Sequence, residues 1–108
     1  MSARLPSGLV ASALIRRVHD AGGFATVLAK GDSDAGGLLL LLGGRRAVPR
    51  FVERGIGPDG RMALIDSTPP DDLESYWRRR RARDPDLWVI ELDIAEDERF
   101  AAETIIDD

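Results

Sequence analysis

The sequence predicts an α+β fold: a single compact domain, in the order α-β-β-β-β-α-β, with a mainly antiparallel sheet and two helices packed on it. Three observations support this prediction. The five consecutive leucines Leu38–Leu42 are typical of a strand covered on both faces, because a strand with one wet face alternates apolar and polar residues. An amphipathic helical pattern occupies residues 7–22, and an apolar strand pattern occupies residues 87–93.

The first element is a helix over residues 7–22. Ser7 is placed to cap its start, and Gly22 and Gly23 are placed to end it in a left-handed turn. His19 falls on the polar face, where we expect an exposed side chain without a role. The apolar stripe consists of Val10, Ala11, Leu14, Ile15, Val18 and Ala21.

Four strands are expected next. The first spans residues 24–30, and a polar turn over residues 31–36 leads to the leucine strand, which should be central and lie beside residues 87–93. A third strand is expected over residues 47–54, where Pro49 indicates a sheet edge or a bulge because it cannot donate a hydrogen bond. After a glycine-rich turn, residues 61–65 form a short fourth strand.

The second helix is expected to begin at Thr68, with prolines and acidic residues in its first turn, and to end at Asp84. Glu74 and Arg78 have the spacing of a favourable helical ion pair. Arg80 interrupts the apolar stripe of this helix, so its stem should lie on the core and its head should reach water or a carboxylate. The apolar stripe itself consists of Leu73, Tyr76 and Trp77.

In the last strand, residues 87–93, Trp88 shares one face with Ile90 and Leu92, and we expect it to be a buried anchor of the core. We assign residues 1–93 to the α+β domain and residues 94–108 to an acidic, partly ordered C-terminal tail. Residues 1–83 hold 14 basic and 9 acidic groups, a net charge of +5, whereas residues 84–108 hold 1 basic and 10 acidic groups, a net charge of −9. The acidic tail is therefore expected to lie near the arginines of residues 78–83 and to screen them.

The composition narrows the possible chemistry. The 108 residues include no cysteine, which excludes disulfides, thiolate catalysis and cysteine metal sites, and His19 alone cannot form a multi-histidine site. The apolar run of residues 9–15 is followed at once by two arginines, so we expect no signal peptide, and no run approaches the roughly 20 residues of a membrane span. These features favour a cytoplasmic location without membrane attachment.

The turn between the first two strands carries a possible metal site. Asp32 and Asp34 resemble the start of a calcium loop, but Gly36 stands where a third ligand is needed and Gly43 where the bidentate glutamate should be. A structural turn is therefore favoured, and a metal site formed by Asp32 and Asp34 is the alternative. The glycine-rich turn over residues 55–60 lacks the lysine and the following helix of a phosphate-binding loop.

Two blocks of sequence carry a resemblance. Residues 13–36 include A-L-I-R-R, A-G-G-F-A-T-V-L and K-G-D-S-D-A-G, and residues 83–91 read R-D-P-D-L-W-V-I-E. Together they resemble a small bacterial family catalogued as domain of unknown function 1491, over roughly residues 5–93. The resemblance implies a compact single domain of the bacterial cytoplasm, and it brings no catalytic residue, cofactor or substrate.

Three functions from different classes are consistent with these residues. A non-enzymatic binding or adaptor domain is favoured, because the sequence has few residues in the pattern of a catalytic site. Its partner would be another protein or a second copy in a homodimer. Weak nucleic-acid binding through the arginine cluster of residues 78–83 is the first alternative, although the pI of about 5.0 lies far from the basic value that such binding favours. A metal-dependent enzyme that uses Asp32 and Asp34 is the second. No cofactor is expected, and the candidate interaction surface consists of Tyr76, Arg78, Arg79, Arg81 and Arg83.

Overall fold

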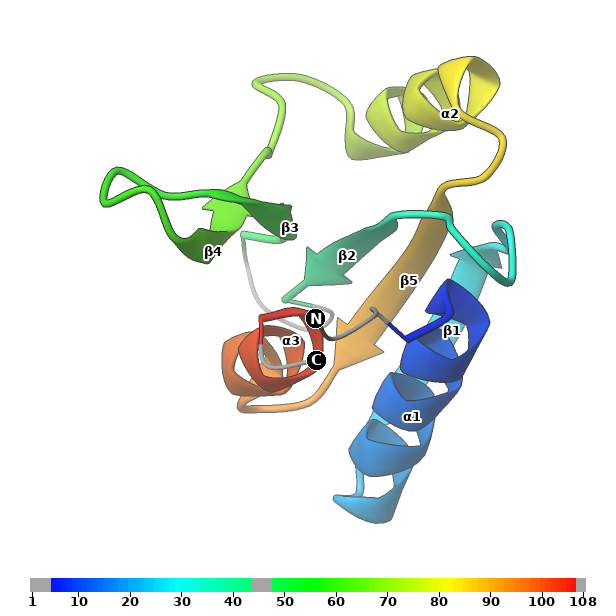
Figure 1. The fold of residues 1–108 in the computed structure, drawn as a ribbon, viewed down its shortest axis with the longest axis vertical. Helices are drawn as coiled ribbons and strands as arrows, with labels where there is room; N and C mark the ends of the chain where they lie inside the picture. The colour runs from blue at the N-terminus through cyan, green and yellow to red at the C-terminus, as the bar shows by residue number, and fades with distance from the viewer. Residues whose placement is uncertain (1–4, 44–47, 107–108) are drawn as a thin grey trace.

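The computed structural model describes residues 5–43 and 48–106 of the chain. In these residues the chain forms an α+β domain whose element order matches the prediction and adds a helix after the last strand (Figure 1). The elements are α1 (Ser7–Asp20), β1 (Phe24–Ala29), β2 (Leu38–Leu42), β3 (Arg50–Ile56), β4 (Met62–Asp66), α2 (Leu73–Arg83), β5 (Trp88–Asp93) and α3 (Asp97–Ile105).

The five strands form one sheet in the order β1-β5-β2-β3-β4. The leucine strand β2 is central, as predicted, and it pairs with β5 on one side and with β3 on the other. The β2–β5 pair is parallel, and the other pairs are antiparallel. The two edges of the sheet are therefore β1 and β4.

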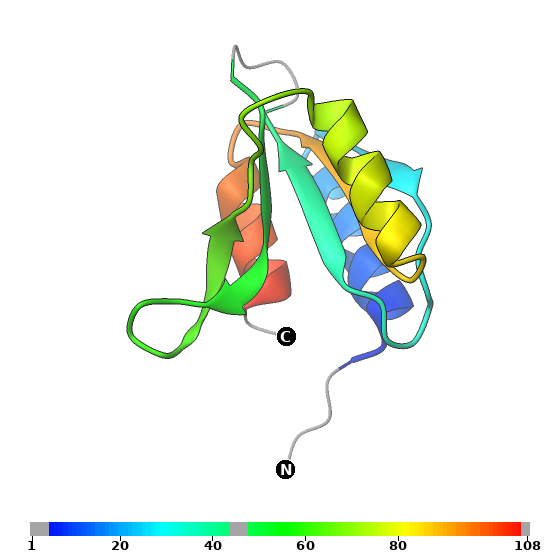
Figure 2. The ribbon, with the colours of Figure 1, turned by 90° about the horizontal axis from the view of Figure 1, so that it is seen from above.

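The sheet is covered on both faces, which explains the unbroken leucine run. Leu40 and Leu42 face the larger core with α1 and α3, whereas Leu39 faces a second cluster beneath α2. In Figure 2, α2 lies in front of the sheet and α1 and α3 lie behind it. Because the helices lie on opposite faces, both faces of the leucine strand are covered within the chain, and no second copy is needed to cover it.

Helix α1 begins differently from the prediction. Pro6 is the N-cap residue, and Ser7 is the first residue of the helix. The Ser7 hydroxyl does not cap the helix; it donates to the carbonyl oxygen of Gly36. The first backbone N–H groups of α1 instead reach the β1–β2 turn, where Gly8 N–H donates to the Ser33 carbonyl oxygen at 2.8 Å. Carbonyl groups of the turn thus satisfy donors that a helix start leaves open. At the other end Gly22 adopts φ +89°, the predicted left-handed turn.

The segment that leads to α2 also differs from the prediction. The helix begins at Leu73, and Asp72 caps it by accepting from Ser75 N–H. Thr68, the expected cap, lies beside the start of β3, where its hydroxyl oxygen accepts from Phe51 N–H at 2.9 Å. The β3 and β4 boundaries are shifted by a few residues from those expected, and the expected strand start at residue 47 lies outside the described residues.

Helix α3 occupies the segment that the sequence assigned to a partly ordered tail. Its side chains Phe100, Ala101 and Ile105 are buried in the larger core. Asp97 is 1% exposed and joins the start of α3 to the end of β2, because its carboxylate accepts from Gly43 N–H at 2.8 Å. The acidic segment is therefore an integral part of the fold up to residue 106.

Candidate functional site

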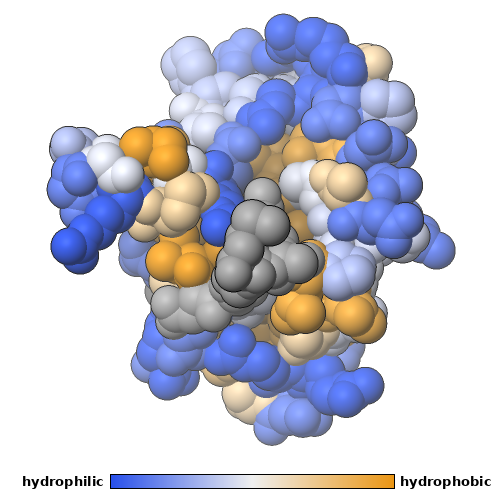
Figure 3. Space-filling view, in the orientation of Figure 1, coloured by the Kyte–Doolittle hydropathy of each residue, from blue (hydrophilic) through white to orange (hydrophobic). Residues whose placement is uncertain are grey.

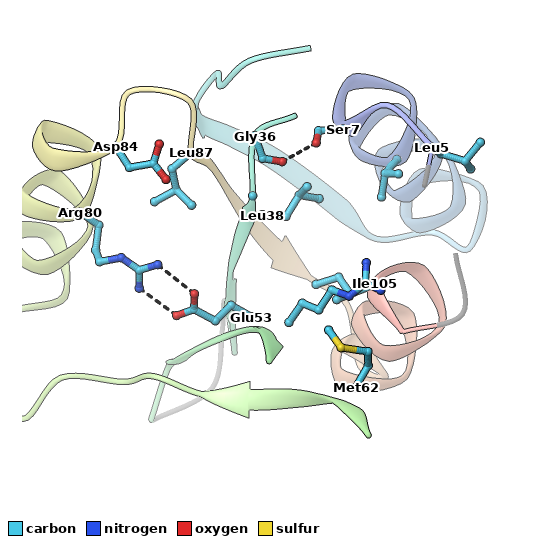
Figure 4. A pocket seen from close by; sticks show the side chains of 13 residues that line it. Leu5, Ser7, Gly36, Leu38, Glu53, Met62, Arg80, Asp84, Leu87 and Ile105 are labelled. Carbon is cyan, nitrogen blue, oxygen red and sulfur yellow. Dashed lines mark hydrogen bonds and ion pairs between the residues drawn. The ribbon is translucent and has the colours of Figure 1, made fainter. Parts of the chain in front are cut away.

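A cavity of about 340 Å³ opens where the N-terminal end of α1, the start of β2, strand β3 and the ends of α2 and α3 come together (Figure 4). This volume is at the lower end of the range of ligand pockets, roughly 300–1,000 Å³. The apolar side chains of its lining are Leu5, Val10, Leu38, Met62, Leu87 and Ile105. Its polar side chains are Ser7, Glu53, Arg54, Arg80 and Asp84.

One wall of the cavity is formed by a bidentate ion pair between Arg80 and Glu53. The Arg80 guanidinium donates to both carboxylate oxygens of Glu53, at 2.8 and 2.9 Å, and to the Tyr76 hydroxyl at 2.7 Å. This is the predicted arrangement, with the arginine stem on the apolar stripe of α2 and its head at a carboxylate. Tyr76 is held in turn by a tilted ring contact with Phe51, whose centroid lies 5.3 Å away. The pair thus ties α2 to β3 across the second face of the sheet.

The electrostatics of this pair follow from its geometry. The hydrogen bonds from Arg80 hold the pKa of Glu53 below its ordinary value of 4.5, although partial burial acts in the opposite direction. The bond to Glu53 likewise raises the pKa of Arg80. Both groups therefore stay charged at neutral pH, and they neutralise each other.

The other polar groups of the cavity are also engaged within the protein. Ser7 donates to Gly36, and the Asp84 carboxylate accepts from Asp86 N–H at 3.2 Å. Arg54 also takes part in an interaction within the chain. Each of the five polar side chains of the lining thus makes at least one contact within the chain, and the wall of the cavity combines polar and apolar surface.

Exposed apolar side chains lie at the mouth of the cavity. Leu5 is 55% exposed and Met62 is 37% exposed, and Ile56, paired with Met62 in the β3–β4 hairpin, is 64% exposed. Figure 3 shows apolar side chains on this face, on the projecting hairpin and beside the start of α1, within a largely charged surface. Sequence reasoning missed this site because its lining comes from six separate segments of the chain.

The structure separates the predicted interaction surface into inner and outer residues. Tyr76 lies between α2 and the sheet, and Arg81 folds back to donate to the carbonyl oxygens of Pro85 and Leu87. Arg78 pairs with Glu74 at 3.2 Å, as predicted, and its guanidinium lies over the ring of Trp77. The remaining members, Arg79 and Arg83, are exposed on the outer side of α2.

The Asp32–Asp34 turn is built as a structural turn. One Asp32 carboxylate oxygen, Oδ2, accepts from the backbone N–H groups of both Asp34 and Ala35, at 3.0 and 2.9 Å. The Asp32 carbonyl oxygen accepts from the indole N–H of Trp88 at 2.8 Å. In residues 5–43 and 48–106 there is no group of three or more histidine, aspartate or glutamate side chains that could hold a metal ion.

The fold and the cavity define a small α+β domain with a five-stranded sheet covered by helices on both faces. The chain belongs to the DUF1491 family, described as a protein of unknown function, whose family model matches residues 5–102. A crystal structure of a DUF1491 family protein from Caulobacter crescentus CB15 shares 33% sequence identity at a TM-score of 0.75, over 90% of this chain and 94% of that chain. The prediction of the family from two sequence blocks is therefore confirmed.

Two solution structures are also similar to this chain. The NMR structure of a DUF1491 family protein from the same organism gives 33% identity and a TM-score of 0.72, over 93% of this chain and 94% of that one. Protein Atu0922 from A. tumefaciens is 28% identical, with a TM-score of 0.70 over 98% of both chains. A comparison with curated proteins found no match. None of the helices in the described parts of the chain is long and apolar enough to cross a membrane.

Proposed function

We propose that this protein is a non-enzymatic binding domain of the bacterial cytoplasm, which holds an apolar side chain of a protein partner in the cavity between α1, β2 and β3. The observation that carries the proposal is the lining of the cavity: each polar side chain makes a contact within the chain, six apolar side chains form the rest of the wall, and two of these, Leu5 and Met62, are exposed at its mouth. A catalytic site would instead need a polar group aimed at a reacting atom.

The surroundings of the cavity support a protein as the partner. Exposed apolar side chains at the rim are typical of a surface that another molecule covers. Around this rim the Arg80–Glu53 pair, Arg54 and Asp84 provide charges of both signs, as in the polar border of a protein interface. The cavity is open on one side, so an extended segment of a partner can place one side chain in it without a change in the backbone.

Binding of nucleic acid through α2 is less favoured. Of the arginines of this helix, Arg78 is paired with Glu74, Arg80 with Glu53, and Arg81 with backbone carbonyl groups. Arg79 and Arg83 remain on the outer surface, which is a small basic patch for a chain of net charge −4.

The test is affinity capture from the native cytoplasm with the tagged chain and two variants. Met62→Arg places a long charged side chain at the mouth of the cavity, whereas Val48→Arg changes an apolar side chain that is 78% exposed and does not line the cavity. We expect a protein that is captured by the parent chain and by Val48→Arg, lost with Met62→Arg, and bound by the purified parent chain in calorimetry. Equal capture by the two variants, or no capture at all, would contradict the proposal.

A further inference from the structure

We propose that a second copy of this chain pairs with edge strand β1, so that two sheets join into one across a two-fold axis. The proposal is independent of the cavity, because no residue of β1 lines it. Strand β1 lies outside β5 at this edge (Figure 1), and no strand covers its outer side in the described chain.

Strand β1 lacks the features that protect an edge strand from pairing. Its six residues, F-A-T-V-L-A, include no charge and no proline, which are the usual devices against edge-to-edge association. Two of its large apolar side chains are exposed: Phe24 at 61% and Val27 at 41%. The other edge strand, β4, ends on Asp66 and has α3 packed against it.

The backbone of β1 shows which groups point outward. Ala25 N–H donates to the exposed His19 ring at 3.2 Å, so Ala25 faces away from β5. Because outward and inward residues alternate in an antiparallel pair, Val27 faces outward too. A bulge between Val27 and Ala29 ends this regular stretch. The outward backbone groups available to a second strand are therefore those of Ala25 and Val27, once the His19 ring releases Ala25.

These positions define one self-complementary register. Placing Thr26 opposite Thr26 of the second copy brings Ala25 opposite Val27 in both directions, which allows four backbone hydrogen bonds. The same register brings the exposed Phe24 of each copy to the Leu28 end of the other. Leu28 borders an open groove between α2 and the sheet, which Trp77, Leu73 and Leu41 also line. No residue of α2 is fully buried, so the ring of Phe24 would cover apolar surface that this chain leaves open.

The charges at the two ends of β1 fit the same arrangement. The exposed Lys30 follows the strand, and the exposed Asp20 lies just before it at the end of α1. With Thr26 at the two-fold axis, the end of β1 that carries Lys30 in each copy lies beside the start of β1 in the other copy, near its Asp20. Opposite charges thus meet at both ends of the joined strands.

Charge substitutions at Thr26 test both the dimer and its register. Thr26 is exposed, and in the proposed dimer it meets its own copy directly, so Thr26→Lys and Thr26→Glu each place like charges opposite one another. We expect the parent chain to show twice the monomer mass of 11.8 kDa in sedimentation equilibrium. Each variant alone should raise the dimer dissociation constant by about tenfold or more, and an equimolar mixture of the two should restore association as a heterodimer.

Two controls keep the result interpretable. Urea unfolding of each variant shows that the fold is retained, which matters most for Thr26→Glu because Glu91 lies opposite on β5. Met62→Arg, at the cavity, should associate like the parent chain. A parent chain that is monomeric at every concentration reached would overturn the proposal. So would a dimer that neither Thr26 variant weakens, or two variants that fail to associate when mixed although each is folded.

Discussion

Arg80 illustrates how a single charged residue can hold two elements together. It sits within the apolar stripe of α2, where a charge without a partner would be costly. Its fork of N–H donors meets both oxygens of Glu53, and the side chains of the two residues are only 28% and 24% exposed. Because water is partly excluded, this pair contributes more than a surface ion pair does.

We expect Glu53→Gln to lower the free energy of unfolding by about 1–3 kcal/mol at pH 7, because the Arg80 guanidinium then loses its charged acceptor. The pKa of Glu53 is lowered in the folded protein, so its contribution is present above the ordinary value of 4.5 and is lost as the pH falls through the folded pKa. The difference between the parent chain and the variant should therefore shrink in acid. Urea unfolding at pH 7 and at steps below pH 4.5 measures it.

Glu74→Gln is the matched control, because Glu74 and Arg78 form an ion pair on the same helix whose side chains are 67% and 64% exposed. An exposed pair of this spacing contributes only about 0.3–0.5 kcal/mol, so this variant should resemble the parent chain. Equal effects of the two substitutions would show that Glu53 has no special role.

The two aspartates of the β1–β2 turn differ in what their side chains do. Asp32 accepts two backbone hydrogen bonds, and no hydrogen bond of the Asp34 carboxylate is seen among the described residues. We expect Asp32→Ala to cost about 1 kcal/mol for each lost bond and Asp34→Ala to cost much less, as measured by urea unfolding.

The same two variants test the metal alternative. If the turn is structural, calorimetric titration with Ca²⁺ and with Mg²⁺ should give no saturable signal for the parent chain or for either variant. Saturable binding by the parent chain that either substitution removes would establish a metal site at Asp32 and Asp34 instead.

At the scale of the elements, strand β5 connects the parts of the fold. It pairs with β1 and with β2, and its Trp88, Ile90 and Leu92 enter the larger core. Val89, together with Leu87 just before the strand, enters the second cluster. Trp88 adds a link to the β1–β2 turn through its indole N–H. Carbonyl groups of the same turn accept hydrogen bonds from the first N–H groups of α1, so β5, the turn and α1 form one connected unit.

We expect Trp88→Ala to lower the free energy of unfolding by roughly 3–5 kcal/mol, since a 6% exposed side chain leaves a large void. Trp88→Phe keeps most of the ring but loses the hydrogen bond to Asp32, so it should cost less; the hydrogen bond itself accounts for about 1 kcal/mol. Trp77→Ala serves as the comparison, because Trp77 belongs to α2 and is only partly buried. A urea midpoint of Trp88→Ala equal to that of the parent chain would show that Trp88 does not anchor the core.

Local patterns in the sequence predicted most of these elements, because periodicity and turn residues act over short distances. The leucine run indicated a strand covered on both faces, and the place of Arg80 in an apolar stripe indicated a head group at water or at a carboxylate; the structure shows the carboxylate of Glu53. Helix α3 was missed because its acidic residues obscured a helical spacing, visible in Phe100, Ala101, Thr104 and Ile105. Thr68 was taken for a helix cap because its role at β3 depends on strand pairing. The cavity depends on six separate segments, and no local pattern encodes it.

At the scale of the whole molecule, the two oppositely charged segments lie on opposite faces of the sheet. The arginines of residues 78–83 belong to α2, whereas the acidic side chains of α3 lie on the α1 side, where Glu103 pairs with Arg17 and Glu98 with Arg50. The expectation that the tail lies near the α2 arginines is therefore wrong for its residues up to 106. The acidic side chains of α3 pair instead with Arg17 on α1 and with Arg50 at the start of β3.

This arrangement changes what removal of the C-terminal segment should do. Deleting residues 95–108 takes Phe100, Ala101 and Ile105 out of the larger core and removes the carboxylate of Asp97 from Gly43. We expect the shortened chain to lose cooperative unfolding rather than to expose a basic surface, since each large core side chain removed costs roughly 2–5 kcal/mol and a domain has only about 5–15 kcal/mol in total.

The double variant Glu98→Gln, Glu103→Gln removes acidic charge from α3 without touching the core, because both side chains are exposed. It should stay folded in circular dichroism, and its binding to single-stranded DNA at low salt should be no stronger than that of the parent chain. A folded double variant that gains binding, with an affinity that falls steeply as salt rises, would show that α3 does screen the arginines over a distance.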